Sequence, residues 1–522
     1  GSHGVGGVLT VSSGPTLVVS NSGHKLTAAS LTHNNSGSIT ISDGEIECTG
    51  KADIDGLLTI SGSGATLDVN GELELSSTTT EAISNGNITV AGDFDADDAS
   101  NFTPTGGTLT MDGSGADATV TIHSSANFNN LTVNSGSYDV DAGSNFDVDG
   151  ALTVSGGELD ILARTITVAG ASDVASGATL NINGSGVYDA NGSFDANGGT
   201  INMDGTARLQ LASTVTNLGT LDNAAGTVEY NGGAQDVIAD DYYDLVIDQS
   251  GNKTAQGAVN VANDMTISNS ATYLTANYTT TVTGATSVGA ILDVNSSSGI
   301  FHAGGGFSAS GNINFSANGI LRFITVSPTS LGTLDNTEGR VIYKNGATNV
   351  LADDYHNLQV VDGGTARTAQ GDINVSGDFI IGSSSELNLG NNTLTITGDA
   401  DINGILDFDN AGVFDANDEF DATGGTVQFT GSGGNLKLGG ATVTSLGNTL
   451  TEGTGTIEYD YAGNQTVLSE TYYNLIINNG TGTKTAGGAL DIDGDLTVTA
   501  GELAMGSNNA DVASGKTVNI DG

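Results

Sequence analysis

The sequence predicts an all-β protein, folded as a parallel β-helix (β-solenoid) of about 22–24 coils. Three observations lead to this fold class: a phrase that returns at a nearly fixed interval, short alternating strand patterns, and a composition rich in Gly and poor in Pro. A fixed interval indicates one structural unit that has been copied, and stacked copies bury a continuous core.

The repeated phrase, Gly-Ala-Thr-Leu-Asp-Val-Asn-Gly in its first copy, begins at five positions separated by 112 to 114 residues: Gly64, Gly177, Gly289, Asn403 and Gly515. We therefore expect one continuous solenoid built from repeats of about 113 residues. The predicted parts are divergent N-terminal coils at 1–63, repeats at 64–176, 177–288, 289–402 and 403–514, and the start of a further repeat at 515–522.

Within each repeat, apolar and polar residues alternate over three or four positions, as in Leu152-Thr-Val154, which is the period of a half-buried strand. Gly, Asn, Asp and Ser separate these patterns and supply turns. Apolar triplets return roughly every 20 to 25 residues, so each long repeat divides into about five coils.

Tandem β-sandwich domains are the alternative fold, because such a domain also has about 100 residues. The solenoid is favoured because no Pro-rich or charged linker recurs at one phase of the repeat. The chain has only 3 Pro and no Trp, which suits thin coils in which Pro would interrupt the ladder of hydrogen bonds.

The formal net charge of −48 argues against nucleic acid as a partner, because phosphate binding requires a cationic face. No apolar stretch is long enough to insert into a bilayer as a helix. Cys48 is the single cysteine, so the fold is expected to form without an internal disulfide.

Acidic residues often lie two positions apart, which places their carboxylates on one face of a strand. Calcium, which takes six to eight oxygen ligands, is the candidate metal for such pairs, and solvation at the surface is the other interpretation. No segment matches the twelve-residue calcium loop, and no other cofactor is expected. The calcium candidates are Asp139, Asp141, Asp147, Asp149, Asp491, Asp493 and Asp495.

Basic residues recur at two phases of the repeat. One set comprises Lys253, Arg367 and Lys484, and the other comprises Arg208, Arg322 and Lys437. We interpret both sets as charge balance on an outer face, with a cation stripe that binds a ligand as the alternative.

Aromatic residues also recur. Phe194, Phe307 and Phe420 are expected to stack inside the solenoid. Neighbouring strand residues point to opposite faces, so one ring of each tyrosine doublet is expected to face outward. The candidates for surface contact with glycans or neighbouring molecules are Tyr242, Tyr243, Tyr472 and Tyr473.

No catalytic residue is predicted, and the chain is not expected to be an enzyme. A β-helix glycosidase or lyase would need two carboxylates, or a carboxylate with a base, in one groove. His123 and His356 lack a metal-ligand or nucleophile partner at a diagnostic spacing.

The phrases Gly226-Thr-Val-Glu-Tyr230, Tyr242-Tyr-Asp-Leu-Val-Ile247 and Gly251-Asn-Lys-Thr254 resemble repeats of very large bacterial cell-surface proteins. They are similar to β-solenoid adhesins of the filamentous-haemagglutinin type and to secreted surface repeat proteins of Bacteroidetes-like bacteria. The resemblance covers residues 64–522. It implies secretion, a parallel β-helix and an adhesive or structural role at the cell surface, and it carries no catalytic residue across.

We therefore expect an extracellular structural or adhesive rod, either the stalk of a surface adhesin or a subunit of a filament that assembles end to end. The phrase at 515–522 starts another copy, so a further coil is expected there from a longer protein or from a second subunit. Expected partners are other copies, other surface proteins or glycans. The alternative function is a β-helix protein that binds or degrades carbohydrate.

Overall fold

The structure is a computed structural model that describes residues 1–77, 80–115, 117–141 and 145–521. The described residues form a parallel β-solenoid of about 24 turns with about 21 residues per coil, and they contain no helix. The predicted fold class is confirmed, and the β-sandwich alternative is wrong. Gly522, the last residue of the fifth repeated phrase, lies outside the described residues.

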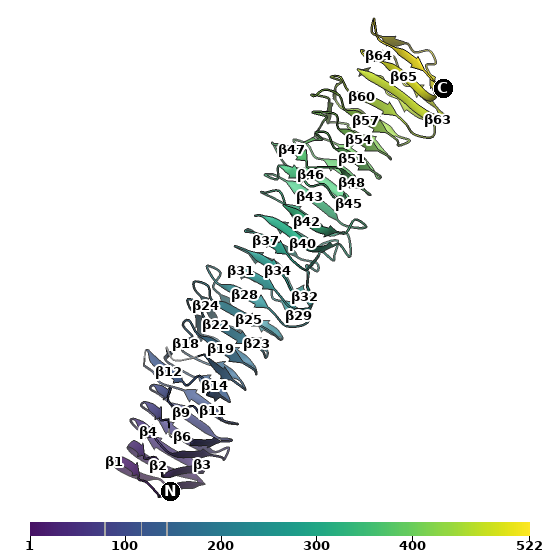
Figure 1. Cartoon of the computed structure of the whole chain (residues 1–522). Coiled ribbons are helices and arrows are strands. Elements are labelled where there is room, and N and C mark those ends of the chain that lie inside the picture. The colour runs from purple at the N-terminus through teal and green to yellow at the C-terminus, as the bar shows by residue number, and fades with distance from the viewer. Residues whose placement is uncertain (78–79, 116, 142–144, 522) are drawn as a thin grey trace. The chain divides into compact units, whose positions relative to one another are not determined.

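Two compact units divide the chain: a first unit, Gly1–Ala262, and a second unit, Asn263–Gly522. In each unit, successive strands follow one another along the stack in sequence order (Figure 1). Two of the 113-residue repeats can be compared inside the second unit, and another lies largely in the first.

The first unit shows how a coil is built. Its strands β22 (Val187–Ala190), β25 (Arg208–Leu211), β28 (Thr227–Tyr230) and β31 (Asp244–Ile247) pair in parallel, each with the equivalent strand of the next coil. Leu209, Val228 and Leu245 occupy one ladder position and are buried. Inward apolar side chains thus stack on one another from coil to coil, which the two-residue alternation predicts.

Equivalent ladders occur twice in the second unit. One contains β39 (Ile300–Ala303), β41 (Ile320–Phe323), β43 (Arg340–Lys344) and β46 (Asn357–Val361). The other contains β54 (Val413–Ala416), β57 (Asn435–Leu438), β60 (Thr456–Tyr459) and β63 (Asn474–Ala486). Because the registers match those of the first unit, residues can be compared position by position between repeats.

Aromatic pairs recur in the core of all three ladders. Tyr188 lies 6.2 Å from Phe194, Phe301 lies 6.5 Å from Phe307, and Phe414 lies 5.9 Å from Phe420, each pair edge to face. All six rings are buried, so the predicted interior position of Phe194, Phe307 and Phe420 is confirmed. Edge-to-face pairs contribute about 0.5–1.5 kcal/mol beyond the area that they bury.

A pair of buried tyrosines joins β28 to the loop that follows it. The hydroxyl oxygens of Tyr230 and Tyr242 are 3.0 Å apart. Tyr242 donates its proton to the Ile238 carbonyl (2.7 Å), and the Ile238 N–H donates to the Tyr230 hydroxyl (3.1 Å). Tyr230 therefore donates to Tyr242, and the two rings and one peptide satisfy one another without water.

The same arrangement, called the tyrosine pair below, recurs in the second unit. Tyr343 and Tyr355 are 3.0 Å apart around the Leu351 peptide, and Tyr459 and Tyr472 are 3.1 Å apart around the Leu468 peptide. The prediction of Tyr242 and Tyr472 as surface contacts is therefore wrong, because each hydroxyl is used inside the core and each residue is fully buried. Tyr243 and Tyr473 are the half-exposed members of the doublets.

Candidate functional site

The acidic residues predicted as calcium candidates lie on outward positions of several coils. Asp147 lies in β16 (Phe146–Val148), Asp149 follows that strand, and both are exposed. Asp149 accepts a hydrogen bond of 2.5 Å from the Asn127 side chain. Asp139, in β15 (Ser137–Val140), is half-buried and lies in register with Asp160 of the next coil. Burial first, and then the Asp160 carboxylate, raise the pKa of Asp139. Asp141 follows this strand and is exposed.

The C-terminal triplet behaves in the same way. Asp491, in β64 (Leu490–Ile492), and the following Asp493 and Asp495 are exposed. Asp491 accepts a hydrogen bond of 3.4 Å from Thr471, and Asp495 accepts one of 2.8 Å from the Thr517 N–H. Within the described ranges, no three His, Cys, Asp or Glu side chains gather closely enough to hold a metal ion.

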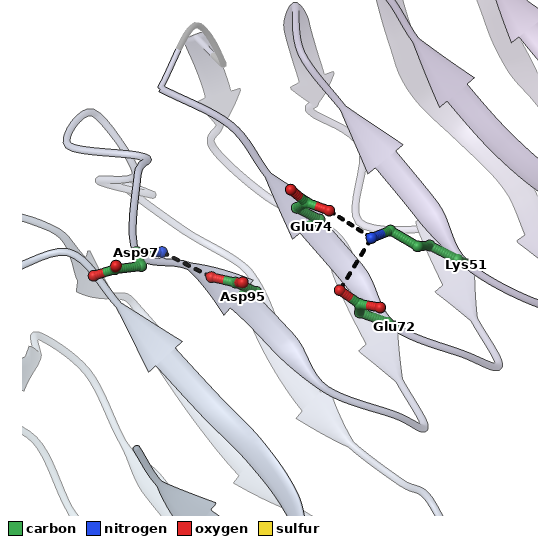
Figure 2. A network of polar contacts seen from close by, with 5 residues as sticks. All are labelled: Lys51, Glu72, Glu74, Asp95 and Asp97. Carbon is green, nitrogen blue, oxygen red and sulfur yellow. Dashed lines mark hydrogen bonds and ion pairs between the residues drawn. The ribbon is translucent and has the colours of Figure 1, made fainter. Parts of the chain in front are cut away.

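An acidic ladder, defined here as Asp53, Glu74 and Asp95, crosses three successive coils of the first unit. Its members lie in register on β4 (Ala52–Ile54), β7 (Leu73–Leu75) and β10 (Phe94–Ala96). Figure 2 shows Lys51 reaching Glu74 (2.5 Å) and Glu72 (3.1 Å) of the following coil. The hydrogen bond to Glu74 raises the pKa of Lys51.

The carboxylates of the acidic ladder repel one another where Lys51 does not pair with them. Burial raises the pKa of Asp53, and the neighbouring carboxylates of Asp55 and Glu74 raise it further. Asp95 is stabilised locally, since it accepts a 3.1 Å hydrogen bond from the Asp97 N–H (Figure 2). Parallel in-register stacking places like charges about 4.8 Å apart, so each carboxylate repels the next.

The first set of basic residues is buried, which corrects the prediction of an outer face. Lys253, Arg367 and Lys484 have no exposed surface. The Lys253 ammonium donates to the carbonyls of Gly232 (2.8 Å) and Gln249 (2.6 Å), and Lys484 donates to those of Tyr461 (2.6 Å) and Gly463 (3.1 Å). These cations hold loop carbonyls rather than a ligand.

Arg367 also binds a backbone carbonyl, since its guanidinium donates a hydrogen bond to the Val361 carbonyl at 3.0 Å. Burial lowers the pKa of Lys253, Arg367 and Lys484 alike, because a low-dielectric environment disfavours the charged form. Neither the charge-balance nor the ligand-stripe interpretation applies to this set.

The second set of basic residues does lie on the outer face. Arg208 is 2.5 Å from Glu229 of the next coil, and Lys437 is 4.0 Å from Glu458 of the next coil. For these two residues the prediction of charge balance is confirmed. Arg322 differs, since its guanidinium donates to Nε2 of His302 at 3.1 Å.

Glu229 and Glu458 are only about 6% exposed although they occupy outward ladder positions. Around Glu229 the surface is hollowed into an open depression of about 530 Å³, with polar walls that include Asn191, Gln210 and Asp248. At Glu229 the floor of this depression holds a carboxylate that pairs with Arg208 of the preceding coil, and Glu458 pairs with Lys437 in the same way.

Two histidine–serine contacts were not expected from the sequence. His123 Nδ1 is 2.9 Å from the Ser125 hydroxyl, and His356 Nδ1 is 3.1 Å from the Ser376 hydroxyl. Each serine hydroxyl also lies 3.0 Å from a backbone carbonyl, that of Ser100 for Ser125 and that of Asn336 for Ser376. His123 Nδ1 also accepts the Ser125 N–H at 3.2 Å, so this ring nitrogen carries no proton, and the Ser125 hydroxyl lies between two acceptors, Nδ1 and the Ser100 carbonyl.

The described residues include no helix that is long and apolar enough to cross a membrane. Neither the search with protein-family models nor the search of curated proteins finds a match to this chain.

Proposed function

We propose that the chain is a non-catalytic, extracellular structural element that carries an adhesive surface on bacterial cells. The observation that supports this proposal is the contrast between the inside and the outside of equivalent coils. The tyrosine pair and the aromatic pair are kept in three repeats, whereas the half-buried outward residue after the aligned tyrosine changes from Asn231 to Lys344 to Asp460. A constant interior with a variable exterior suits a scaffold that displays contacts along its length.

Cell-surface placement can be tested with antibodies raised against the outward residues around Lys51 and Glu74. The proposal predicts that they label intact cells of the organism that makes the protein, and that external protease removes the signal. Labelling that requires permeabilised cells would contradict the proposal. An antibody against a cytoplasmic protein of the same cells provides the control for leakage.

Association by stacking is the proposed mode of assembly, with other copies or other surface proteins as partners. Val8 in β1 (His3–Val11) and Ile520 in β67 (Val518–Ile520) are 60% and 70% exposed. A further coil placed on either strand would bury these side chains and pair the open strand edge. Such a coil can come from adjoining sequence or from another molecule.

Sedimentation velocity over a range of protein concentrations separates the two sources. Stacking between molecules predicts larger species at high concentration, and Ile520→Asp, which places a charge on the contact, should abolish them. Unchanged sedimentation of the parent chain at every concentration would leave adjoining sequence as the source and contradict self-assembly. Val326→Asp, at a 40% exposed valine outside these strands, is the matched control.

A further inference from the structure

One outward position differs between the three equivalent ladders in a way that changes the local charge. Glu229 in β28 and Glu458 in β60 align with Ile342 in β43, by the register of each strand with the strand before it. Ile342 is 5% exposed, so it is covered by its neighbours as the two glutamates are. The repeat that contains Ile342 has lost the buried carboxylate that faces a basic side chain in the other two.

Neighbouring positions change in the same direction. Arg340 replaces Thr227 and Thr456, since all three begin the aligned strands. His302 replaces Asp189 and Asp415 at the preceding coil, and Lys344 replaces Asn231 and Asp460 immediately after the aligned tyrosine. Three acidic side chains of the 403–514 repeat thus correspond to His302, Ile342 and Lys344 here.

The resulting group is called the cationic face: His302, Arg322, Arg340 and Lys344, which lie on three successive coils of the second unit. The Nε atoms of Arg322 and Arg340 are buried and have no hydrogen-bond partner among the described residues. His302 accepts from Arg322 and is therefore neutral, and burial and then Arg322 and Lys344 lower its pKa. The positive charge of this face resides on the two guanidinium groups and the Lys344 ammonium.

One carboxylate is in contact with this face. Asp362 lies 2.7 Å from the Lys344 ammonium, and the Asp362 side chain is 59% exposed. Exposed ion pairs contribute little and exchange readily with another anion. Lys344 can therefore transfer its contact from Asp362 to a ligand while Arg322 and Arg340 remain available.

We propose that the cationic face binds an anionic polysaccharide, a sugar chain that carries carboxylate or sulfate groups. Planar guanidinium groups bind such groups through paired, charge-assisted hydrogen bonds. Because Arg322 lies on one coil and Arg340 and Lys344 lie on the next, about 4.8 Å away, the face suits an extended ligand that lies along the stack with successive anionic groups.

A second copy of this chain fits the face less well. A stable protein interface buries at least about 1,000 Å², which extends far beyond four side chains. The surrounding surface of both molecules is acidic, given the net charge of −48, and would be brought into contact. A slender ligand avoids this repulsion because its contact is confined to the cationic face.

Single-stranded nucleic acid is disfavoured for a different reason. Proteins that bind it without sequence preference combine basic grooves with exposed aromatic rings that stack on the bases. The rings beside the cationic face, Phe301, Phe323 and Tyr343, are buried in the core. The face therefore offers charge without a stacking surface.

The decisive experiment is calorimetric titration of the whole chain with oligogalacturonate, which carries carboxylates, and with dextran sulfate, which carries sulfates. Binding of either probe, weakened by raising salt from about 50 to about 200 mM, is the expected result, and neutral dextran should not bind. The two charged probes distinguish the chemical source of the anion. No binding of either one would overturn the proposal.

The variant Ile342→Glu gives the sharpest test, because Glu229 and Glu458 show that the fold already accepts glutamate at this position. The restored carboxylate should pair with Arg322 and weaken binding roughly tenfold or more. The matched control is Lys437→Gln, which removes a basic residue at the position of Arg322 in another repeat and should leave binding unchanged.

Three further outcomes would overturn the proposal. Equal binding by Ile342→Glu and the parent chain would place the contact elsewhere. Equal affinity for oligodeoxythymidylate would show an unselective attraction for polyanions. Self-association that Ile342→Glu abolishes would assign the face to a second copy. The proposal does not rest on the structural role above, since a soluble carbohydrate-binding protein would give the same titration and fail the cell-surface test.

Discussion

At the scale of single residues, the tyrosine pairs explain why polar aromatic side chains are tolerated in so narrow a core. Each hydroxyl of Tyr230 and Tyr242 has a partner, and the loop peptide at Ile238 contributes both its N–H and its carbonyl. Loss of one member leaves buried polar groups without a partner, which costs more than the hydrogen bond itself contributes.

Tyr230→Phe is therefore expected to lower the free energy of unfolding by about 1–3 kcal/mol, because the Ile238 N–H loses its acceptor and the Tyr242 hydroxyl loses one of its two hydrogen bonds. Urea denaturation followed by circular dichroism measures the change. Tyr243→Phe, in the half-exposed position next to the pair, is the control and should change stability by less than about 0.5 kcal/mol. Equal effects of the two variants would contradict the role given to the pair.

The buried tyrosines also predict a loss of stability in alkali. Burial raises the pKa of Tyr230 and of Tyr459 to about 12, above the ordinary value of about 10. The unfolded chain releases these protons first, so the stabilisation is complete below pH ~10 and is lost as the pH rises toward 12. A pH series of urea midpoints, with tyrosinate absorbance recorded in parallel, should show ionisation and unfolding together. Ionisation of all tyrosines near their ordinary pKa in a folded chain would contradict this account.

At the scale of the element, the turn glycine Gly339 determines where β43 begins. Gly339 precedes β43 with a φ of 80°, and a Cβ there would lie 2.2 Å from the Phe315 ring. Gly339→Ala combines a left-handed backbone with a clash in the core, so we expect a loss of at least about 2 kcal/mol.

Thermal unfolding of Gly339→Ala and of Gly364→Ala provides the comparison. A Cβ at Gly364 meets no atom within 4 Å, so this control should be neutral or slightly stabilising. A melting temperature for Gly339→Ala equal to that of the parent chain would show that the turn can be rebuilt without glycine.

Strand elements were predictable from the sequence because a two-residue alternation determines which side chains face the core. Phe194 illustrates this success. The buried cations illustrate the limit: Lys253 lies on an inward position of β32 (Gly251–Ala255), and only the loop carbonyls that it holds make that position acceptable. The carbonyls belong to Gly232 of the preceding coil and to Gln249 of the adjacent loop, and nothing in the sequence pattern indicates that they point at Lys253.

Tyr242 fails for a related reason, since alternation predicts one inward ring per doublet but not which one. The exchange of Glu229 for Ile342 was visible in the aligned phrases, yet its meaning requires the register. Only the ladder places Gln210 opposite Glu229, where Arg208 reaches the carboxylate diagonally, and shows that Arg322 lies opposite Ile342 instead.

At the scale of the whole molecule, self-repulsion opposes the fold. The chain carries a net charge of −48, and stacked coils bring carboxylates such as Asp53, Glu74 and Asp95 into register. Raising NaCl from about 10 to about 150 mM shortens the Debye length from about 30 to about 8 Å, so the melting temperature is expected to rise.

Equal shifts in NaCl and KCl would identify screening as the cause. A larger shift in CaCl2 at the same ionic strength would indicate calcium binding, the interpretation first raised by the paired aspartates. A fall in melting temperature with NaCl would contradict net self-repulsion.

The central claim is that these repeats stack as coils of a parallel β-solenoid, and electron cryo-microscopy of the purified chain tests it most directly. Within each unit, Gly1–Ala262 and Asn263–Gly522, the predicted result is a stack of density layers ~4.8 Å apart, one layer for each coil of about 21 residues. Repeating bodies of about 100 residues, each made of two packed sheets, in place of such layers would contradict the solenoid.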